Sequence, residues 1–293
     1  KKNEYTNATT GQLVNPTTND WDYELIDMLG YNKEMFQPVS MPGTVVGEFT
    51  QDIQNEVGFN CKVVLPATHD TGSAVLAVPT NDDNAIYISS GTWSLMGIER
   101  KEADCSEKSC EMMQANFTNE GGYDHRFRYL KNIMGLWMIQ SVKKEFTEDL
   151  SFAEICERAS KETITSLVDC NDDCFLAPKS MIEAVKKFCR DSKQQVPETV
   201  GEIAAVIYNS LAKCYGETIR EIEEITGNTY DTIYVVGGGA NAGYLNELTA
   251  KYTGKKVSAG PSEATAIGNI VVQMLHDGVF KDLPEARTCV GKS

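Results

Sequence analysis

The sequence contains no apolar run long enough to cross a bilayer, which takes about 20 residues, and it is short of positive charge. Its 27 lysines and arginines stand against 42 aspartates and glutamates, which gives a formal net charge of −15. This balance excludes the broad cationic surface that binds nucleic acids or anionic membranes. We therefore expect neither a nucleic acid nor a membrane among its partners.

Metal-binding and disulfide patterns are also missing. There are only three histidines, and none of the nine cysteines forms a C-x-x-C pair. A structural zinc site or a disulfide framework is therefore not expected. An odd number of cysteines without such spacing is typical of free thiols in a reducing compartment. We expect a cytoplasmic protein whose own side chains hold no metal.

Strand and helix patterns alternate along the chain, which is typical of an α/β protein. The predicted strands span residues 61–65, 85–89, 93–98, 232–236 and 257–259. The predicted helices span residues 20–29, 71–78, 132–146 and 263–276, together with a long helix that follows Pro197 and ends at Gly227. The turn at 90–92 joins two of the strands in a hairpin.

A glycine loop is the first candidate nucleotide site. The strand 232–236 runs into Gly237-Gly238-Gly239, and a helix is expected from about residue 241. Glycines let a phosphate approach the backbone, and a helix N-terminus offers free N–H groups. The dinucleotide fingerprint does not fit, because the spacing to Gly243 is one residue too long and the next strand ends without an acid for a ribose.

Two further nucleotide motifs were compared with the sequence. Gly291-Lys292-Ser293 resembles the end of a P-loop, but the first glycine of that motif is Ala286 here. The remaining interpretation is an actin-like ATPase, in which the hairpin turn at 89–92 and the glycine loop hold the nucleotide. A purely structural turn is the alternative for either loop.

The segment Thr68-His69-Asp70-Thr71 is a candidate catalytic loop, because it follows the predicted strand 61–65. Side chains at the carboxyl end of a strand lie where α/β proteins collect reacting groups. A carboxylate there can accept the proton of a hydroxyl nucleophile, and phosphoryl transfer needs little more than that, positioning and charge neutralisation. The alternatives are an Asx turn in which Asp70 caps the next helix, and a structural role for His69.

Taken in order along nearly the whole chain, the motifs resemble the FGGY carbohydrate kinases. The resemblance rests on the runs at 69–71, 87–97, 119–122, 131–137, 197–199, 236–239 and 259–265. It implies an α/β, actin-like ATPase (ribonuclease H-like) fold with a mixed sheet flanked by helices. It also implies that residues 1–77 are the C-terminal remnant of the sugar-binding domain and that residues 78–293 are the ATP-binding domain.

The resemblance further implies a kinase that phosphorylates L-rhamnulose at its 1-hydroxyl with ATP and Mg²⁺. In that case Asp70 is the proton acceptor, and the sugar is bound by His69, Asp70, Thr71 and Asn132. ATP is contacted by Thr92, Gln140 and Gly238. Asn132 and Gln140 are expected about two turns apart on one helix, facing the same side. No protein ligand to the metal is implied.

The sequence departs from the FGGY pattern at its ends, since it has no initiator methionine, no first-domain phosphate loop and no predicted closing helix. We therefore expect a fragment that needs the missing N-terminal domain of the same chain, and that alone is not an active kinase. Two alternatives stay open. One is a related kinase for L-fuculose or another ketose, and the other is a non-catalytic, actin-like sugar sensor.

Overall fold

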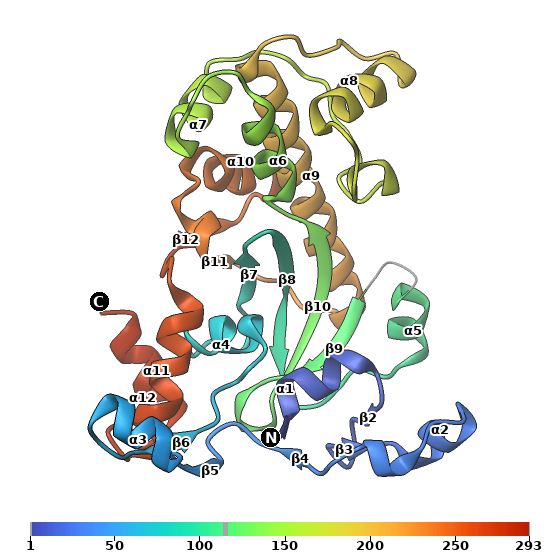
Figure 1. Ribbon diagram of the computed structural model, residues 1–293. Helices are drawn as coiled ribbons and strands as arrows, with labels where there is room; N and C mark the ends of the chain where they lie inside the picture. Colours follow the sequence, from blue (N-terminus) through green and yellow to red (C-terminus); the bar gives the residue numbers. More distant parts are fainter. Residues whose placement is uncertain (1, 114–116, 293) are drawn as a thin grey trace.

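A six-stranded mixed sheet forms the centre of the computed structural model, which describes residues 2–113 and 117–292 (Figure 1). The strand order is β12-β11-β7-β8-β10-β9. Strands β12, β11 and β7 run parallel, whereas β8, β10 and β9 are each antiparallel to their neighbours. The strands are β7 (Ile86–Ser90), β8 (Trp93–Arg100), β9 (Phe117–Gly121), β10 (Phe127–Met134), β11 (Thr232–Val236) and β12 (Lys256–Ala259).

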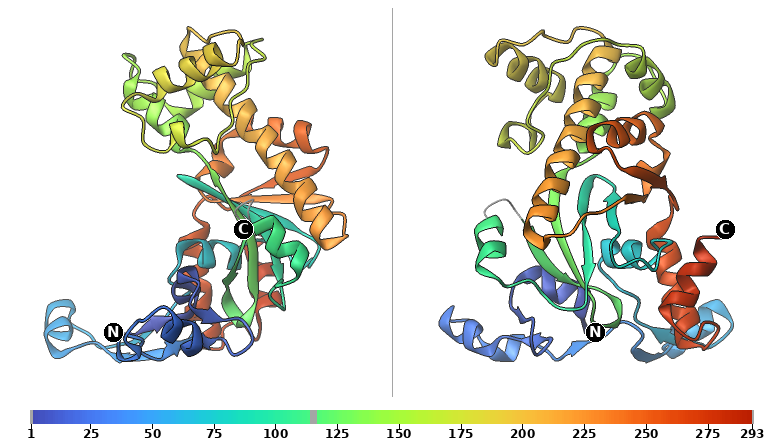
Figure 2. Two further views of the ribbon diagram at one scale, coloured as in Figure 1. Left: turned by 90° about the vertical axis from the view of Figure 1, so that its right-hand side faces the viewer. Right: turned by 180° about the vertical axis from the view of Figure 1, so that it is seen from behind.

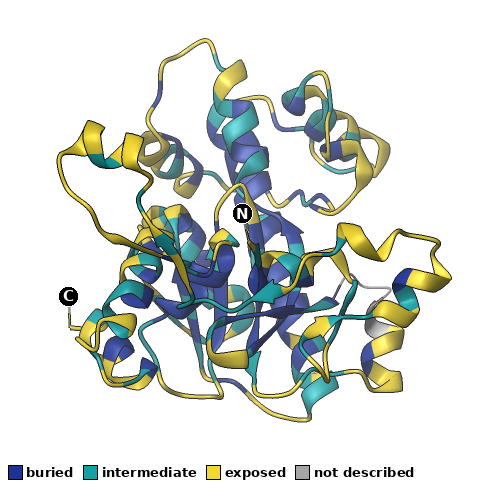
Figure 3. Cartoon of the chain, turned by 60° about the horizontal axis from the view of Figure 1, so that its bottom comes forward, coloured by how far each residue is buried: buried dark blue, intermediate teal, exposed yellow. Residues whose placement is uncertain are grey.

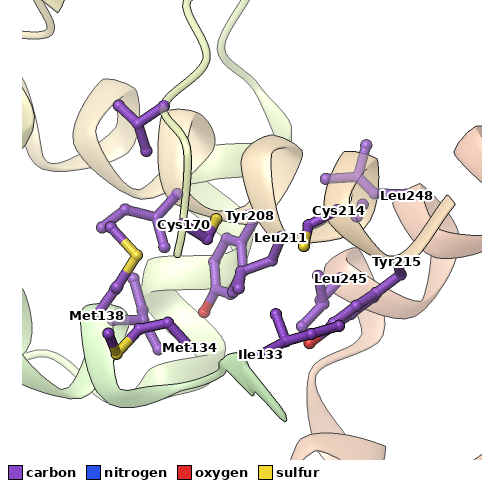
Figure 4. Close-up of a cluster of buried hydrophobic side chains, with 14 of the residues drawn as sticks. Ile133, Met134, Met138, Cys170, Tyr208, Leu211, Cys214, Tyr215, Leu245 and Leu248 are labelled. Atoms are coloured by element: carbon purple, nitrogen blue, oxygen red, sulfur yellow. The ribbon is translucent and has the colours of Figure 1, made fainter. Parts of the chain in front are cut away.

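One face of the sheet is covered by the long helix α9 (Val200–Thr226) and its neighbours (Figures 1 and 2). Thr199 and Glu202 form a capping box at its start, and Gly227 ends it in the left-handed region. Figure 4 shows α9 side chains packed against α10 and the end of β10. Helix α10 (Gly243–Thr253) packs on α9, whereas α6 (Trp137–Glu145), α7 (Phe152–Ser160) and α8 (Met181–Asp191) lie beyond the end of the sheet (Figure 1).

The opposite face carries α4 (Asp70–Leu76), α11 (Ala264–His276) and α12 (Leu283–Val290). Side chains of β7 point alternately to the two faces of the sheet. Ile86 and Ile88 belong to the core under α9, whereas Tyr87 packs with α4. Helices α4 and α11 approach closely where Gly268 faces the carbonyl oxygen of Ser73. This packing matters for the site, because α4 begins at Asp70.

The segment before α4 is mostly exposed (Figure 3) and holds only short elements. Between residues 10 and 63, Ile26 is the one buried residue. Gly121 donates its N–H to Thr9 Oγ1 at 2.9 Å, which fastens the start of the segment to β9. The elements are β1 (Asn3–Glu4), α1 (Tyr5–Ala8), β2 (Val14–Asn15), β3 (Asp20–Trp21), α2 (Tyr23–Met28), β4 (Val39–Ser40), β5 (Val45–Glu48), α3 (Gln51–Val57) and β6 (Lys62–Val64).

Most predicted elements form, but the helix predicted over 132–146 is wrong. Residues up to Met134 belong to β10, where Asn132 stands opposite Leu95 of β8, and α6 starts only at Trp137. The chain turns between the two elements, and the N–H of Leu136 donates to the carbonyl of Gly91 at 3.1 Å. Apolar residues at the end of the strand continued the helical spacing of α6, so the sequence pattern did not show the boundary.

Two smaller corrections concern the C-terminal part. The turn Gly238–Asn241 is a 3₁₀ helix, so α10 begins at Gly243 rather than at 241. A closing helix does form as α12, because Asp282 accepts the N–H of Glu285 and caps its first turn. Among the described helices, none combines the length and the apolar character needed to cross a membrane.

Candidate active site

A cavity of about 700 Å³ opens between the start of α4, the β7–β8 hairpin and β10. Five of the residues that the sequence predicted for the site line it, namely His69, Asp70, Thr71, Thr92 and Asn132. The structure therefore brings the predicted catalytic loop, the hairpin turn and Asn132 to one place, although Asn132 reaches it from a strand.

Asp70 is the first residue of α4, and its side chain is 78% exposed. Its Oδ1 accepts the N–H of Thr71 at 2.6 Å, and its carbonyl accepts the hydroxyl of Thr265 on α11 at 3.2 Å. His69, not Asp70, occupies the N-cap position, and it makes no side-chain capping bond. The carboxylate of Asp70 is thus fixed at the helix start and open to the cavity.

The loop before Asp70 is held by a buried carboxylate from the N-terminal segment. Glu4 accepts the backbone N–H of Thr68 at 3.1 Å and its hydroxyl at 2.7 Å. The neighbouring N–H of His69 donates to Thr6 Oγ1 at 3.1 Å. Charge-assisted bonds of this kind fix a loop more firmly than neutral ones. No motif in the sequence indicates a role for Glu4.

His69 lies between the cavity and a buried ion pair. Its Nδ1 is 3.0 Å from Arg128 Nη2 and 3.4 Å from Glu120 Oε2, and its Nε2 is 3.7 Å from Asp70 Oδ1. Burial, followed by the positive charge of Arg128, lowers the pKa of His69. Glu120 lines the cavity and pairs with Arg128 at 3.1 Å. The sequence contained Glu120 within a family motif, but nothing in its pattern showed that a strand would bury the two charges.

Gln140 and Gly238 lie in a second cavity of about 340 Å³. Thr92, which lines the first cavity, donates its hydroxyl to Oε1 of Gln140, which lines the second, at 3.4 Å. The N–H of Trp137 donates to the carbonyl of Thr92 at 2.9 Å, which joins the hairpin turn to the start of α6. The second cavity is otherwise lined mainly by apolar side chains, among them Leu136, Ile139, Phe152, Ala153, Cys156, Tyr208 and Ala242.

The family model for the C-terminal domain of the FGGY carbohydrate kinases matches residues 86–276, and the model for the N-terminal domain matches residues 1–77. The chain belongs to the FGGY family of carbohydrate kinases. The predicted actin-like ATPase fold, with a mixed sheet flanked by helices, is confirmed. The FGGY assignment places the hairpin and the glycine loop within the segment matched by the C-terminal model.

Among relatives of this FGGY chain, the rhamnulokinase of Oceanobacillus iheyensis is 50% identical over 100% of the chain and 62% of the relative. The rhamnulokinase of Halalkalibacterium halodurans is 47% identical over 99% of the chain and 61% of the relative. The solved gluconate kinase of Lactobacillus acidophilus superposes with a TM-score of 0.72 at 14% identity, over 97% of the chain and 57% of that structure. The chain thus spans about three fifths of the length of these proteins.

Proposed function

We propose that the protein carrying this sequence is a kinase that transfers the γ-phosphoryl group of ATP to the 1-hydroxyl of L-rhamnulose. The observation that carries the proposal is a pair of cavities whose linings meet at the hydrogen bond between Thr92 and Gln140, one containing Asp70 and the other mainly apolar. Two substrates of different chemistry can meet at such a junction. The names of the rhamnulokinase relatives support the choice of sugar.

In the proposed reaction, Asp70 accepts the proton of the sugar hydroxyl. The hydroxyl oxygen forms a bond to the γ-phosphorus while the bond from that phosphorus to the bridging oxygen of ADP breaks. The exposed carboxylate at the start of α4 suits this role because it is open to the cavity yet held by Thr71. We assign sugar contacts to His69, Asp70, Thr71 and Asn132, which all line the first cavity.

For the nucleotide, we assign Thr92 to the phosphates and Gln140 and Gly238 to the part of ATP in the second cavity. Within the described residues, no three His, Cys, Asp or Glu side chains are grouped so that they could hold a metal ion. No step is therefore assigned to a protein-held metal. We propose that Mg²⁺ enters with the ATP phosphates, since this ion usually keeps several water ligands and binds through phosphate.

We also propose that residues 1–77 are the last part of the sugar-binding domain and that residues 78–293 are the ATP-binding domain. The ranges of the two family models support this division. Helix α4 ends just before the proposed boundary and packs on α11. The candidate base at its start therefore stands where the two domains would meet.

A coupled ADP-release assay on the complete gene product tests the function, with L-rhamnulose, L-fuculose and D-xylulose as substrates. We expect turnover with L-rhamnulose, and a preference for L-fuculose or D-xylulose would select the related kinase instead. Asp70→Asn should lower kcat by roughly 10²–10⁴-fold, as expected for loss of a general base. Asp83→Asn, which changes an exposed carboxylate outside the cavity, is the control.

A variant that keeps full turnover after Asp70→Asn would overturn the base assignment. Binding of sugar without any turnover by the wild-type protein would favour the sugar sensor. The polypeptide of residues 1–293 is assayed beside the complete gene product. We predict that this polypeptide, without the rest of the protein, shows no kinase activity.

A further inference from the structure

Arg128 is a charged residue that lies entirely inside the protein. It stands on β10, its side chain is fully buried, and its Nε and Nη2 donate to the carbonyl oxygen of Gly121 at 3.1 and 2.9 Å. A buried arginine is costly unless its donors find acceptors. One of those acceptors is the imidazole of His69, at 3.0 Å. Arg128 thus contacts His69, a residue that lines the cavity, from the protein interior.

The chemistry of this contact decides the protonation of His69. Arginine has only N–H donors and stays charged, so the nitrogen that faces it must offer a lone pair. His69 Nδ1 is therefore the acceptor, and the proton of the neutral ring is on Nε2. The competing arrangement has an Nδ1–H that donates to Glu120 Oε2. That oxygen is farther from Nδ1, at 3.4 Å, and it lies nearer to Arg128 Nη2, with which it forms an ion pair at 3.1 Å.

We propose that Arg128 is a positioning residue that fixes His69 as the neutral imidazole with its proton on Nε2, and so makes His69 a hydrogen-bond donor beside Asp70. This inference deepens the proposed function, on which the role of Asp70 as base rests. In the pair, Asp70 takes up the proton of the sugar hydroxyl, whereas His69 holds an oxygen by donating to it. His69 then does not compete with Asp70 for the proton.

The charges around His69 come from four elements. Arg128 on β10 disfavours the imidazolium, whereas Glu120 on β9, Asp70 on α4 and Glu4 on β1 favour it. Burial and Arg128 together outweigh the three carboxylates, because the pKa of His69 lies below its ordinary value. The neutral ring therefore persists despite three nearby negative charges.

Nitrogen-15 NMR of the histidine-labelled 293-residue chain tests the proposal without any substrate. We expect His69 to show a single tautomer with a protonated Nε2 and an unprotonated Nδ1, and a pKa below its ordinary value of 6.5. A protonated Nδ1, or a mixture of tautomers in the wild-type chain, would overturn the proposal. This measurement does not depend on kinase activity, so its failure and the failure of the proposed function can be told apart.

In Arg128→Met, His69 should no longer be restricted to the Nε2–H tautomer. Its pKa should rise, since the three carboxylates remain. The matched control is Arg126→Met, two residues earlier in the chain, which removes an ion pair with Asp83 and should leave His69 unchanged. If Arg128→Met does not fold, the double variant Arg128→Met/Glu120→Gln removes both buried charges and makes the same tautomer prediction. An unchanged His69 spectrum in a folded variant would contradict the role of Arg128.

Discussion

The charge of His69 depends on burial and on Arg128, and this has a consequence for stability at acid pH. The pKa of His69 is lowered on folding from its ordinary value of 6.5. As the pH falls below 6.5, the unfolded chain takes up a proton before the folded one does, so the free energy of unfolding decreases. We predict that the contribution of His69 is complete above pH 6.5 and is lost as the pH falls through the folded pKa.

Urea unfolding at a series of pH values, for wild type and His69→Gln, measures this contribution. The difference in unfolding free energy should change in favour of the variant as the pH falls below 6.5. His276→Gln, at an exposed position, is the control. A difference that moved in favour of wild type at low pH would contradict the prediction.

Substitutions at two neighbouring glycines should have different effects, one on stability and the other on nucleotide binding. A Cβ at Gly239 would lie 1.9 Å from Ser90 Oγ and 3.3 Å from the Ser90 carbonyl oxygen, whereas a Cβ at Gly238 meets nothing within 4 Å. We predict that Gly239→Ala lowers the unfolding free energy by about 1–3 kcal/mol, the range for overpacking. Gly238→Ala should fold normally and raise the KM for ATP.

Thermal or urea unfolding and steady-state kinetics of the two variants check this pair, and each variant is the control of the other. Equal stability of both would contradict the close approach at Gly239. An unchanged KM for ATP in Gly238→Ala would remove the assignment of Gly238 to the nucleotide.

Single residues differed in how well the sequence revealed them. Asp70 and Thr92 could be predicted because each lies in a local motif at the end of a strand, and the structure puts both at one cavity. Glu4, Glu120 and Arg128 could not, since a charged residue is normally exposed. Their burial depends on segments far apart in the chain, as the bond between Glu4 and Thr68 shows.

At the scale of elements, the contact between α4 and α11 sets the position of the candidate base. A Cβ at Gly268 on α11 would lie 1.9 Å from the carbonyl oxygen of Ser73 on α4, so only glycine permits this approach. We predict that Gly268→Ala lowers both the unfolding free energy, by about 1–3 kcal/mol, and kcat, because α4 must shift and it carries Asp70. Gly243→Ala on α10, where a Cβ meets nothing, is the control.

Unfolding curves and kinase assays on the same preparations check this prediction. Loss of stability with unchanged kcat would show that α4 does not transmit the shift to Asp70. Wild-type behaviour in both measurements would contradict the close packing itself.

The elements that the sequence predicted well carry their own end signals. Helix α9 has its capping box and Gly227, and the β7–β8 hairpin has its turn at Gly91. The boundary between β10 and α6 has no such signal, because apolar residues continue through it and only Gly135 and Leu136 separate the strand from the helix. Helical spacing read across a strand end therefore placed Asn132 on the wrong element, whereas the resemblance to the FGGY family had implied it as a site residue, and it lines the cavity.

At the scale of the whole molecule, the site depends on a segment that contributes little to the core. Residues 10 to 63 bury a single residue, yet the chain before them supplies Glu4 and Thr6 to the loop that precedes Asp70. The contacts join residues more than sixty positions apart. The N-terminal segment thus contacts the rest of the protein at the candidate active site, through hydrogen bonds to the loop that precedes Asp70.

This fastening predicts that Glu4→Gln affects sugar binding more than ATP binding. The amide of glutamine would turn an N–H group toward the backbone and hydroxyl donors of Thr68, so the unfolding free energy should fall by about 1.5–3 kcal/mol, the value of charge-assisted bonds. The KM for sugar should rise more than the KM for ATP, because Thr92 and Gln140 are held by α6 instead. Glu48→Gln, which changes an exposed carboxylate of the same segment that accepts a hydrogen bond from Asn60, is the matched control in both measurements. Equal effects of the two variants would show that Glu4 does not hold the loop.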